Sequence, residues 1–199
     1  MSGARPWLLA AFLLSGFAAL IYQLVWQRSL FAIYGIDSAS VTVVVTAFMA
    51  GLGVGSLLGG AWSRRFPALP LFAAFELGIG AYGLASLPLF AWAGSFTLGL
   101  PRLGTGLVTF ALVLVPTTLM GATLPLLVAH AARRSGSVGR SVGTLYFANT
   151  LGASAACFLA ASAILRLFGM AGSVLLAAAL NVLLGVGVLA LARREEAAA

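Results

Sequence analysis

Lysine is absent from this 199-residue chain, and histidine and cysteine occur once each. A single cysteine cannot form a disulfide within the chain, and Cys157 lies among small apolar residues, where a thiol serves as a packing group. Without lysine there is no phosphate-cradling Gly-x-x-x-x-Gly-Lys loop. One histidine and one cysteine are too few for a zinc-type site. The single histidine lies at a membrane edge, where it cannot complete a Ser-His-Asp set unless the remaining acids converge on it. We therefore expect no metal, no cofactor and no catalytic constellation, although an enzymatic role is left open.

Charge of either sign is also scarce. Charged residues make up 8% of the chain and hydrophobic residues 62%, with a mean hydropathy of +1.10, whereas soluble domains carry about 25% charged residues. The net charge of +7 comes from arginines that stand singly or in pairs between apolar segments. Such a distribution indicates membrane topology and not a nucleic-acid interface. The lipid bilayer is therefore the expected partner, and no nucleic acid is expected.

Six apolar segments are long enough to cross a bilayer as helices. The expected spans cover residues 7–26, 40–62, 69–92, 104–130, 141–165 and 173–192. If the N-terminus lies inside, eight arginines fall in inside segments and three in outside loops, as the positive-inside rule requires. The sequence thus predicts an all-α, single-domain integral membrane protein with six transmembrane helices, N-in and C-in, in the inner (plasma) membrane. Asp37 or Ser38 is expected to cap the second span.

Glu76 is the one carboxylate inside a long apolar run, because Asp37, Glu195 and Glu196 lie in a loop or at the C-terminus. A charged side chain at membrane depth costs at least about 2.5–3.5 kcal/mol and normally faces a protein interior or a wet cavity. Two interpretations stand. Glu76 is either a structural, protonated carboxyl that bonds a neighbouring helix, or a proton- or cation-binding group in a pathway.

Other polar side chains lie within the apolar spans and suit either a binding cavity or adhesion between helices. Around Glu76 we select as candidate substrate- or ion-binding residues Thr123, Tyr146, Asn149, Gln23 and Asn181. Pro116 and Pro125 each remove a backbone donor from the fourth span and free a carbonyl at depth. They indicate either a kinked packing helix or a broken helix that lines a substrate site.

Small residues recur along two helices. Gly51, Gly55 and Gly59 are four residues apart and share one helix face, which allows another backbone to approach closely. Plain helix packing is the simpler interpretation. A second set, Gly152, Ala156 and Ala160, forms a similar face. We also expect a homodimer in which these two faces pack against another copy.

Five stretches carry a resemblance to a known family. They are Ser15–Arg28, Phe48–Gly60, Glu76–Gly80, Leu119–Leu127 and Gly143–Ala153. In this order they resemble the membrane portion of the spermidine-synthase-like membrane proteins, a fused major-facilitator/spermidine-synthase family. The resemblance implies a fold like half of a major-facilitator transporter. Two departures stand out: Gln23 occupies a position where the family commonly has glutamate, and Ser63-Arg64-Arg65 stands where the family often has Ala-Asp-Arg.

In fused members of this family a cytosolic aminopropyltransferase domain follows the helices. The sequence here stops at Ala199, soon after the sixth span, so that reaction is not carried over; the chain is a stand-alone member or the membrane part of something longer. The leading hypothesis is a non-enzymatic membrane module that transports a small, polyamine-type cation or anchors a cytosolic synthase-like partner. The alternative is a membrane subunit of an aminopropyltransferase-like enzyme whose catalytic domain is on another chain.

Overall fold

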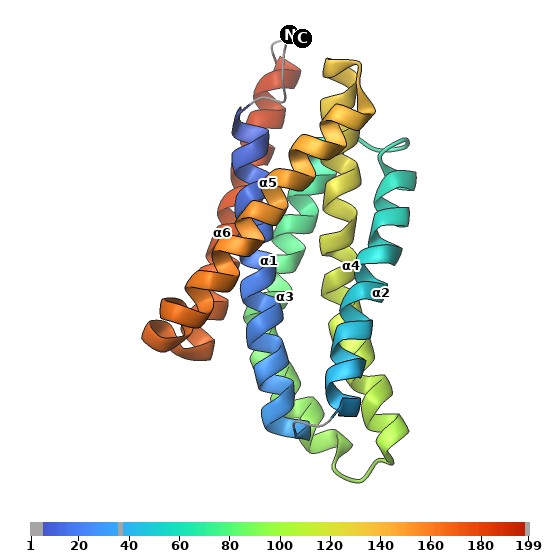
Figure 1. The fold of residues 1–199 in the computed structure, drawn as a ribbon. Coiled ribbons are helices and arrows are strands. Elements are labelled where there is room, and N and C mark those ends of the chain that lie inside the picture. The colour runs from blue at the N-terminus through green and yellow to red at the C-terminus, as the bar shows by residue number, and fades with distance from the viewer. Residues whose placement is uncertain (1–5, 36–37, 198–199) are drawn as a thin grey trace.

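The computed structural model describes residues 6–35 and 38–197, and all of its regular elements are helices. In chain order they are α1 (Pro6–Tyr34), α2 (Ser38–Trp62), α3 (Ala68–Thr97), α4 (Arg102–Ser135), α5 (Val138–Leu159), the π-helical segment η1 (Ala160–Ile164) and α6 (Leu165–Ala197) (Figure 1). The all-α fold class expected from the sequence is confirmed. The helices lie lengthwise beside one another in an elongated bundle.

Five helical stretches of the described chain are long and apolar enough to cross a membrane. The fifth, Val138–Arg194, takes α5, η1 and α6 together, because no loop separates them. The chain nevertheless reverses at Gly169, whose φ of 63° and ψ of −171° lie in a region that only glycine adopts readily. Figure 1 shows α5 and α6 running in opposite directions from this turn, so that α1 begins and α6 ends at the same end of the bundle.

Several helices continue beyond the apolar stretches that predicted them. The expected spans over residues 7–26 and 69–92 end too early, because α1 runs to Tyr34 and α3 runs to Thr97. The Tyr34 and Thr97 hydroxyls lie 3.1 Å apart and join these two helix ends. The predicted cap at Asp37 lies outside the described residues, and the side chain of Ser38 is not described either.

Helices α2 and α4 pack backbone to backbone through the glycine face of α2. A Cβ atom added at Gly55 would collide with the Thr118 carbonyl, and one added at Gly59 would lie 2.7 Å from the Ala122 Cα. At Gly51 it would collide with a threonine side chain of the same helix α4. The packing interpretation of these glycines is therefore confirmed.

The second small-residue face is also used inside the chain. A Cβ atom at Gly152 of α5 would collide with the Leu13 carbonyl of α1, and Ala156 and Ala160 are fully buried. Neither small-residue face is thus open to a second copy. Helices of the same chain occupy both faces, so a homodimer, which stays a prediction, would have to pack through other surfaces.

Helices α1 and α3 run in the same direction with a nearly constant offset. Hydrogen-bonded side-chain pairs join Ser15 to Glu76, Trp26 to Ser86 and Thr97 to Tyr34. Their sequence separations are 61, 60 and 63 residues. Because the separation is nearly constant, residues that advance by the same number along α1 and α3 remain opposite one another. This is the arrangement expected of two parallel helices. These three bonds fix the register between α1 and α3 over most of their length.

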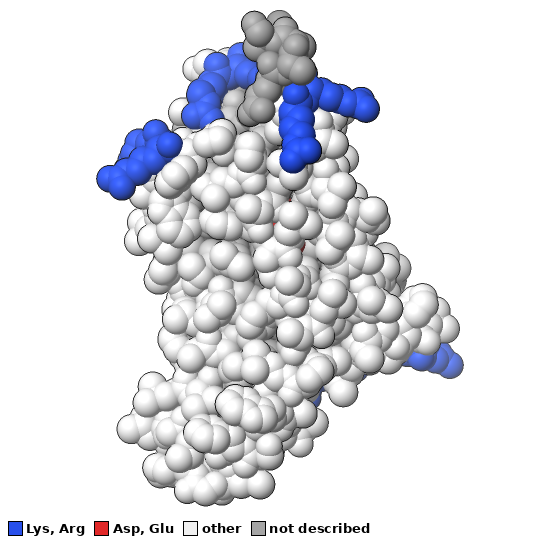
Figure 2. All heavy atoms as spheres, turned by 180° about the vertical axis from the view of Figure 1, so that it is seen from behind, with Lys and Arg blue, Asp and Glu red and all other residues white. Residues whose placement is uncertain are grey.

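Arginines gather at one end of the bundle. The arginine-rich end, where α2, α4 and α6 finish, holds Arg64, Arg65, Arg133, Arg134, Arg140, Arg193 and Arg194. The opposite, arginine-poor end holds Arg28, Arg102 and Arg166. Figure 2 shows this asymmetry on one face, where basic side chains crowd one end and the surface between the ends is almost free of charge.

Candidate functional site

A polar layer separates two apolar clusters inside the bundle. Toward the arginine-rich end lies a cluster that contains Leu8, Phe12, Phe72, Leu126, Leu145 and Leu184. Toward the arginine-poor end lies a second cluster that contains Tyr22, Trp26, Ile79, Met120, Ala156 and Ala177. In sequence, α1, α3, α4 and α6 each have one polar residue between their contributions to the two clusters, and on α5 the one polar residue of that interval that is not exposed is Asn149. These residues are Ser15, Glu76, Thr123, Asn149 and Asn181.

Glu76 lies at the centre of this layer and is fully buried. Ser15 of α1 donates a hydrogen bond to Oε1 at 2.6 Å, and Asn181 of α6 donates one from Nδ2 to Oε2 at 2.5 Å. Gly80, one turn along α3, lets α6 approach, because a Cβ atom there would lie only 3.3 Å from the Asn181 Cβ and the Ala178 carbonyl. The carboxyl group therefore links three helices through both of its oxygens.

Both partners of Glu76 are neutral. No ion pair to Glu76 occurs among the described residues, whose arginines all lie near the ends of helices. Taking an unpaired ion out of water costs several kcal/mol, and hydrogen bonds from two neutral donors offset only part of what an opposite charge would supply. This geometry suits a carboxyl group that is neutralised by a bound proton or by a cation.

Two buried polar atoms in this part of the bundle have no hydrogen-bond partner among the described residues. They are Asn181 Oδ1 and the Tyr22 hydroxyl. The Tyr22 hydroxyl packs against Gly83, about two turns along α3 from Glu76. Its ring stacks on Trp26 with centroids 4.9 Å apart, and the Trp26 Nε1 donates to Ser86 Oγ at 2.9 Å. Unpaired buried polar atoms of this kind are uncommon and mark a place where water, a proton or an ion is accommodated.

Helix α4 is continuous through both of its prolines, so the broken-helix alternative is wrong for this structure. Pro116 cannot donate to the carbonyl of Leu112, one turn earlier. The Tyr82 hydroxyl of α3 donates to that carbonyl at 2.6 Å and replaces the missing bond. Thr117 and Thr118 hydroxyls donate to carbonyls of their own helix around the same point. The carbonyl that Pro116 frees is therefore satisfied by a side chain of the neighbouring helix α3.

Two of the other predicted site residues lie in the polar layer without contacting the Glu76 carboxyl through a hydrogen bond. Asn149 is half-buried on α5 and packs against Gly16, the neighbour of Ser15, so closely that a Cβ atom there would lie 2.7 Å from the Asn149 Nδ2. Thr123 is buried on α4 and donates to the Met120 carbonyl at 2.7 Å. The structure thus brings Glu76 and Asn181 into direct contact and places Asn149 and Thr123 at the same level.

Tyr146 does not belong to this site. Its side chain is 61% exposed on the outer face of α5, so the expectation that it lines a cavity around Glu76 is wrong. Gln23 is half-buried on α1, beyond the polar layer and about 100° around the helix from Tyr22. Neither residue contributes to the hydrogen bonds of Glu76.

Two residues at this site were not selected from the sequence. Ser15 and Tyr22 both lie in the first span, where serine and tyrosine are compatible with packing or an interfacial position. The signal that identifies them is their seven-residue spacing, which places both on one helix face, matched by the same spacing of Glu76 and Gly83 on α3. Among the described residues no group of three or more His, Cys, Asp or Glu side chains could hold a metal ion.

Comparisons with known proteins add no relative to this picture: the chain matches no protein-family model, no curated protein and no solved structure.

Proposed function

We propose that this chain is a membrane module that binds and moves a small cation, with Glu76 as the group that exchanges a proton for the cargo. The single observation that carries the proposal is a fully buried carboxyl whose two oxygens are held by neutral donors from two other helices. A group of this kind at membrane depth is a functional site by default, because an uncompensated charge there is costly. The resemblance to spermidine-synthase-like membrane proteins suggests a polyamine-type amine as the cargo.

The exchange has a simple geometry. When Glu76 is ionised, both oxygens accept, from Ser15 and from Asn181. When it carries a proton, one oxygen becomes a donor and needs an acceptor. Turning over the Asn181 amide presents its unpaired Oδ1 to that proton, since amide groups offer a donor on one side and an acceptor on the other. An ammonium group that replaces the proton pairs with the ionised carboxylate.

We further propose six passes with both termini on the cytoplasmic side of an inner or plasma membrane. The reversal at Gly169 supports two passes within the stretch from Val138 to Arg194. The described arginines, seven at one end and three at the other, support an inside location for the arginine-rich end. In this orientation Glu76 lies about 12 Å from the inside start of α3, since it is eight residues along that helix.

A second role is favoured by the same arginine-rich end. Seven exposed or terminal arginines form a surface that suits an acidic, cytosolic, synthase-like partner, so that the chain would be a membrane anchor or a subunit of an aminopropyltransferase-like enzyme. That role makes no use of Glu76. The two functions are therefore separable by substitution at Glu76, which anchoring tolerates and transport does not.

The test is uptake of radiolabelled spermidine and putrescine by proteoliposomes with an imposed pH gradient. The wild type should accumulate amine in exchange for protons, and Glu76→Gln should not. Ser86→Ala is the matched control, because it removes a buried hydrogen bond from the same helix and leaves the carboxyl in place. Folding of all three is checked by thermal unfolding in detergent. If the wild type shows no uptake with the pH gradient imposed in either direction, the transport proposal fails and the anchoring role takes its place.

A further inference from the structure

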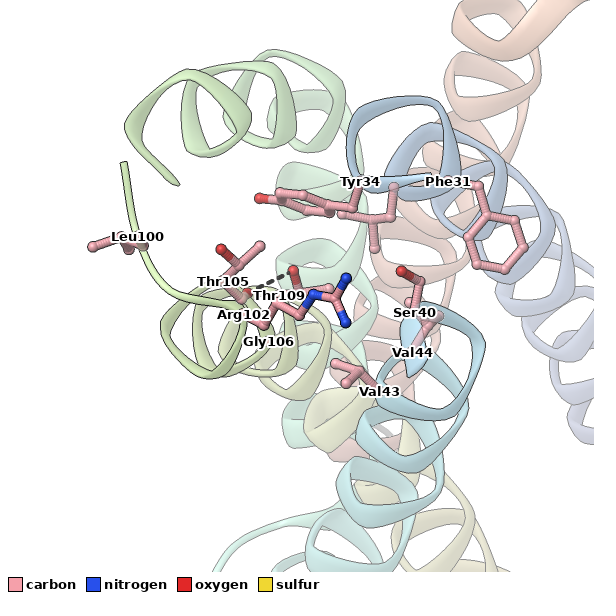
Figure 3. Close-up of a pocket in the computed structure, with 11 residues that line it drawn as sticks. Phe31, Tyr34, Ser40, Val43, Val44, Leu100, Arg102, Thr105, Gly106 and Thr109 are labelled. Carbon is pink, nitrogen blue, oxygen red and sulfur yellow. Dashed lines mark hydrogen bonds between the residues drawn. The ribbon is translucent and has the colours of Figure 1, made fainter. Parts of the chain in front are cut away.

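A cavity of ≈ 270 Å³ opens at the arginine-poor end, far from Glu76 along the bundle. It lies between the last turn of α1 and the first turns of α2 and α4 (Figure 3). Its walls are mixed, with Leu30, Val43 and Val44 on the apolar side and Arg102 with Ser40 and Thr105 on the polar side. No sequence motif predicted this site.

Among the described residues that line the cavity, Arg102 is the one that carries a charge. Figure 3 shows its guanidinium turned from α4 across the opening toward Ser40 at the start of α2. Arg102 is exposed, as an arginine at a membrane interface ordinarily is, and its head group faces the cavity. Guanidinium groups have only donors, in a planar fork that matches a carboxylate or a phosphate. The polar side of the cavity therefore suits an anion.

The remaining geometry sets the kind of anion. The aliphatic side chains opposite Arg102 offer apolar contact to a short hydrocarbon part, and the volume lies just below the usual range of small-molecule sites, about 300–1,000 Å³. Thr109 at the base of the cavity donates its hydroxyl to the Thr105 carbonyl at 3.0 Å, so it offers an acceptor and no free proton. The anion is thus bound at the mouth by Arg102, and the apolar part lies deeper.

We propose that this cavity binds one small carboxylate- or phosphate-bearing amphiphile, with the anionic group on Arg102 and the apolar part against Leu30, Val43 and Val44. A phospholipid head group from the surrounding leaflet and a free short-chain acid share this chemistry. The proposal does not depend on Glu76 or on cation transport, since the two sites lie in different parts of the bundle.

The test uses hexanoate as the probe, with the protein in nanodiscs of zwitterionic lipid and binding measured by calorimetry. Arg102→Gln should weaken binding at least tenfold. Arg166→Gln is the matched control, because it removes the same charge from the same end without lining the cavity, and it should bind like the wild type. Hexanol, which has the tail without the charge, should bind at least tenfold more weakly than hexanoate.

Two further arms complete the design. Gly106→Leu fills the cavity while it keeps Arg102, so it should also abolish binding and guards against misfolding of the arginine variant. Adding phosphatidylglycerol to the nanodiscs distinguishes the sources: competition with hexanoate assigns the site to a lipid head group, and no competition assigns it to a free acid. Equal hexanoate affinity in the wild type and in a folded Arg102→Gln variant, or hexanol binding as tight as hexanoate binding, would overturn the proposal.

Discussion

Replacing Tyr82 with phenylalanine removes one hydroxyl from the interface between α3 and α4. That hydroxyl donates to the Leu112 carbonyl at 2.6 Å, which has no donor in its own helix because residue 116 is proline. Hydrogen bonds between membrane helices contribute about 0.6 kcal/mol on average and up to about 1.7 kcal/mol. A carbonyl left unsatisfied raises the cost, so we expect Tyr82→Phe to lower the free energy of unfolding by about 1–2 kcal/mol.

A double-mutant cycle isolates this bond. Pro116→Ala restores a backbone N–H that donates to the Leu112 carbonyl within α4, so in that background the Tyr82 hydroxyl has no special role. We expect Tyr82→Phe to cost less than about 0.5 kcal/mol there, which gives a coupling of about 1 kcal/mol between the two positions. The free energies come from reversible unfolding in mixed micelles titrated with dodecyl sulfate. Equal costs of Tyr82→Phe in the two backgrounds would refute the argument, because they would show that the hydroxyl does not replace the bond lost at the proline.

Three further predictions follow from the packing and the topology. Gly55→Leu should separate α2 from α4 and lower the free energy of unfolding by more than about 3 kcal/mol, since the added side chain would collide with the backbone of α4. The effect should not depend on an oligomer, so unfolding midpoints measured at several protein concentrations check both points. Single cysteines at Ser137 and Leu98, in a Cys157→Ser background, should react with a membrane-impermeant maleimide from the inside and the outside, respectively; reversal of either would contradict the six-pass topology. Gly169→Ala should destabilise the turn between the last two passes by about 1–2 kcal/mol, because alanine is strained at positive φ, and an unchanged melting temperature would contradict the reversal there.

The apolar helices were predictable because a long run of apolar residues marks a helix that is shielded from water. The run looks the same whether its residues contact lipid or protein. For the same reason, hydropathy does not show which face of each helix is turned to the interior of the protein. Tyr146 and Asn149 are three residues apart on α5, yet the first is exposed and the second packs against Gly16. In a soluble helix a polar stripe distinguishes outside from inside, but in lipid both faces are apolar. The sequence therefore identified polar residues at depth without showing which of them face the interior.

Glu76 and Asn181 were accessible to sequence reasoning for different reasons. A lone carboxylate in an apolar run requires an explanation, and an asparagine near the middle of the last span suggests a partner for it. Ser15 gave no such signal, because a serine in an apolar helix can bond to a carbonyl of its own helix at little cost. Its role depends on the parallel register of α1 and α3, which is a property of the fold. The cavity at Arg102 was hidden for the same reason, since it is formed by residues from three helices that are distant in sequence.

The exchange of a proton for a cation at Glu76 is tested most directly by counting protons as the cation binds. Spermidine is titrated into the purified protein in weakly buffered solution at several values between pH 5 and 8, and the released protons are followed with a pH indicator. Binding of a cation favours the ionised carboxyl, so the account predicts proton release and an affinity that rises with pH, both lost in a folded Glu76→Gln variant. Spermidine affinity that is independent of pH, or identical in the wild type and in Glu76→Gln, would contradict the account and leave Glu76 as a structural link between α1, α3 and α6.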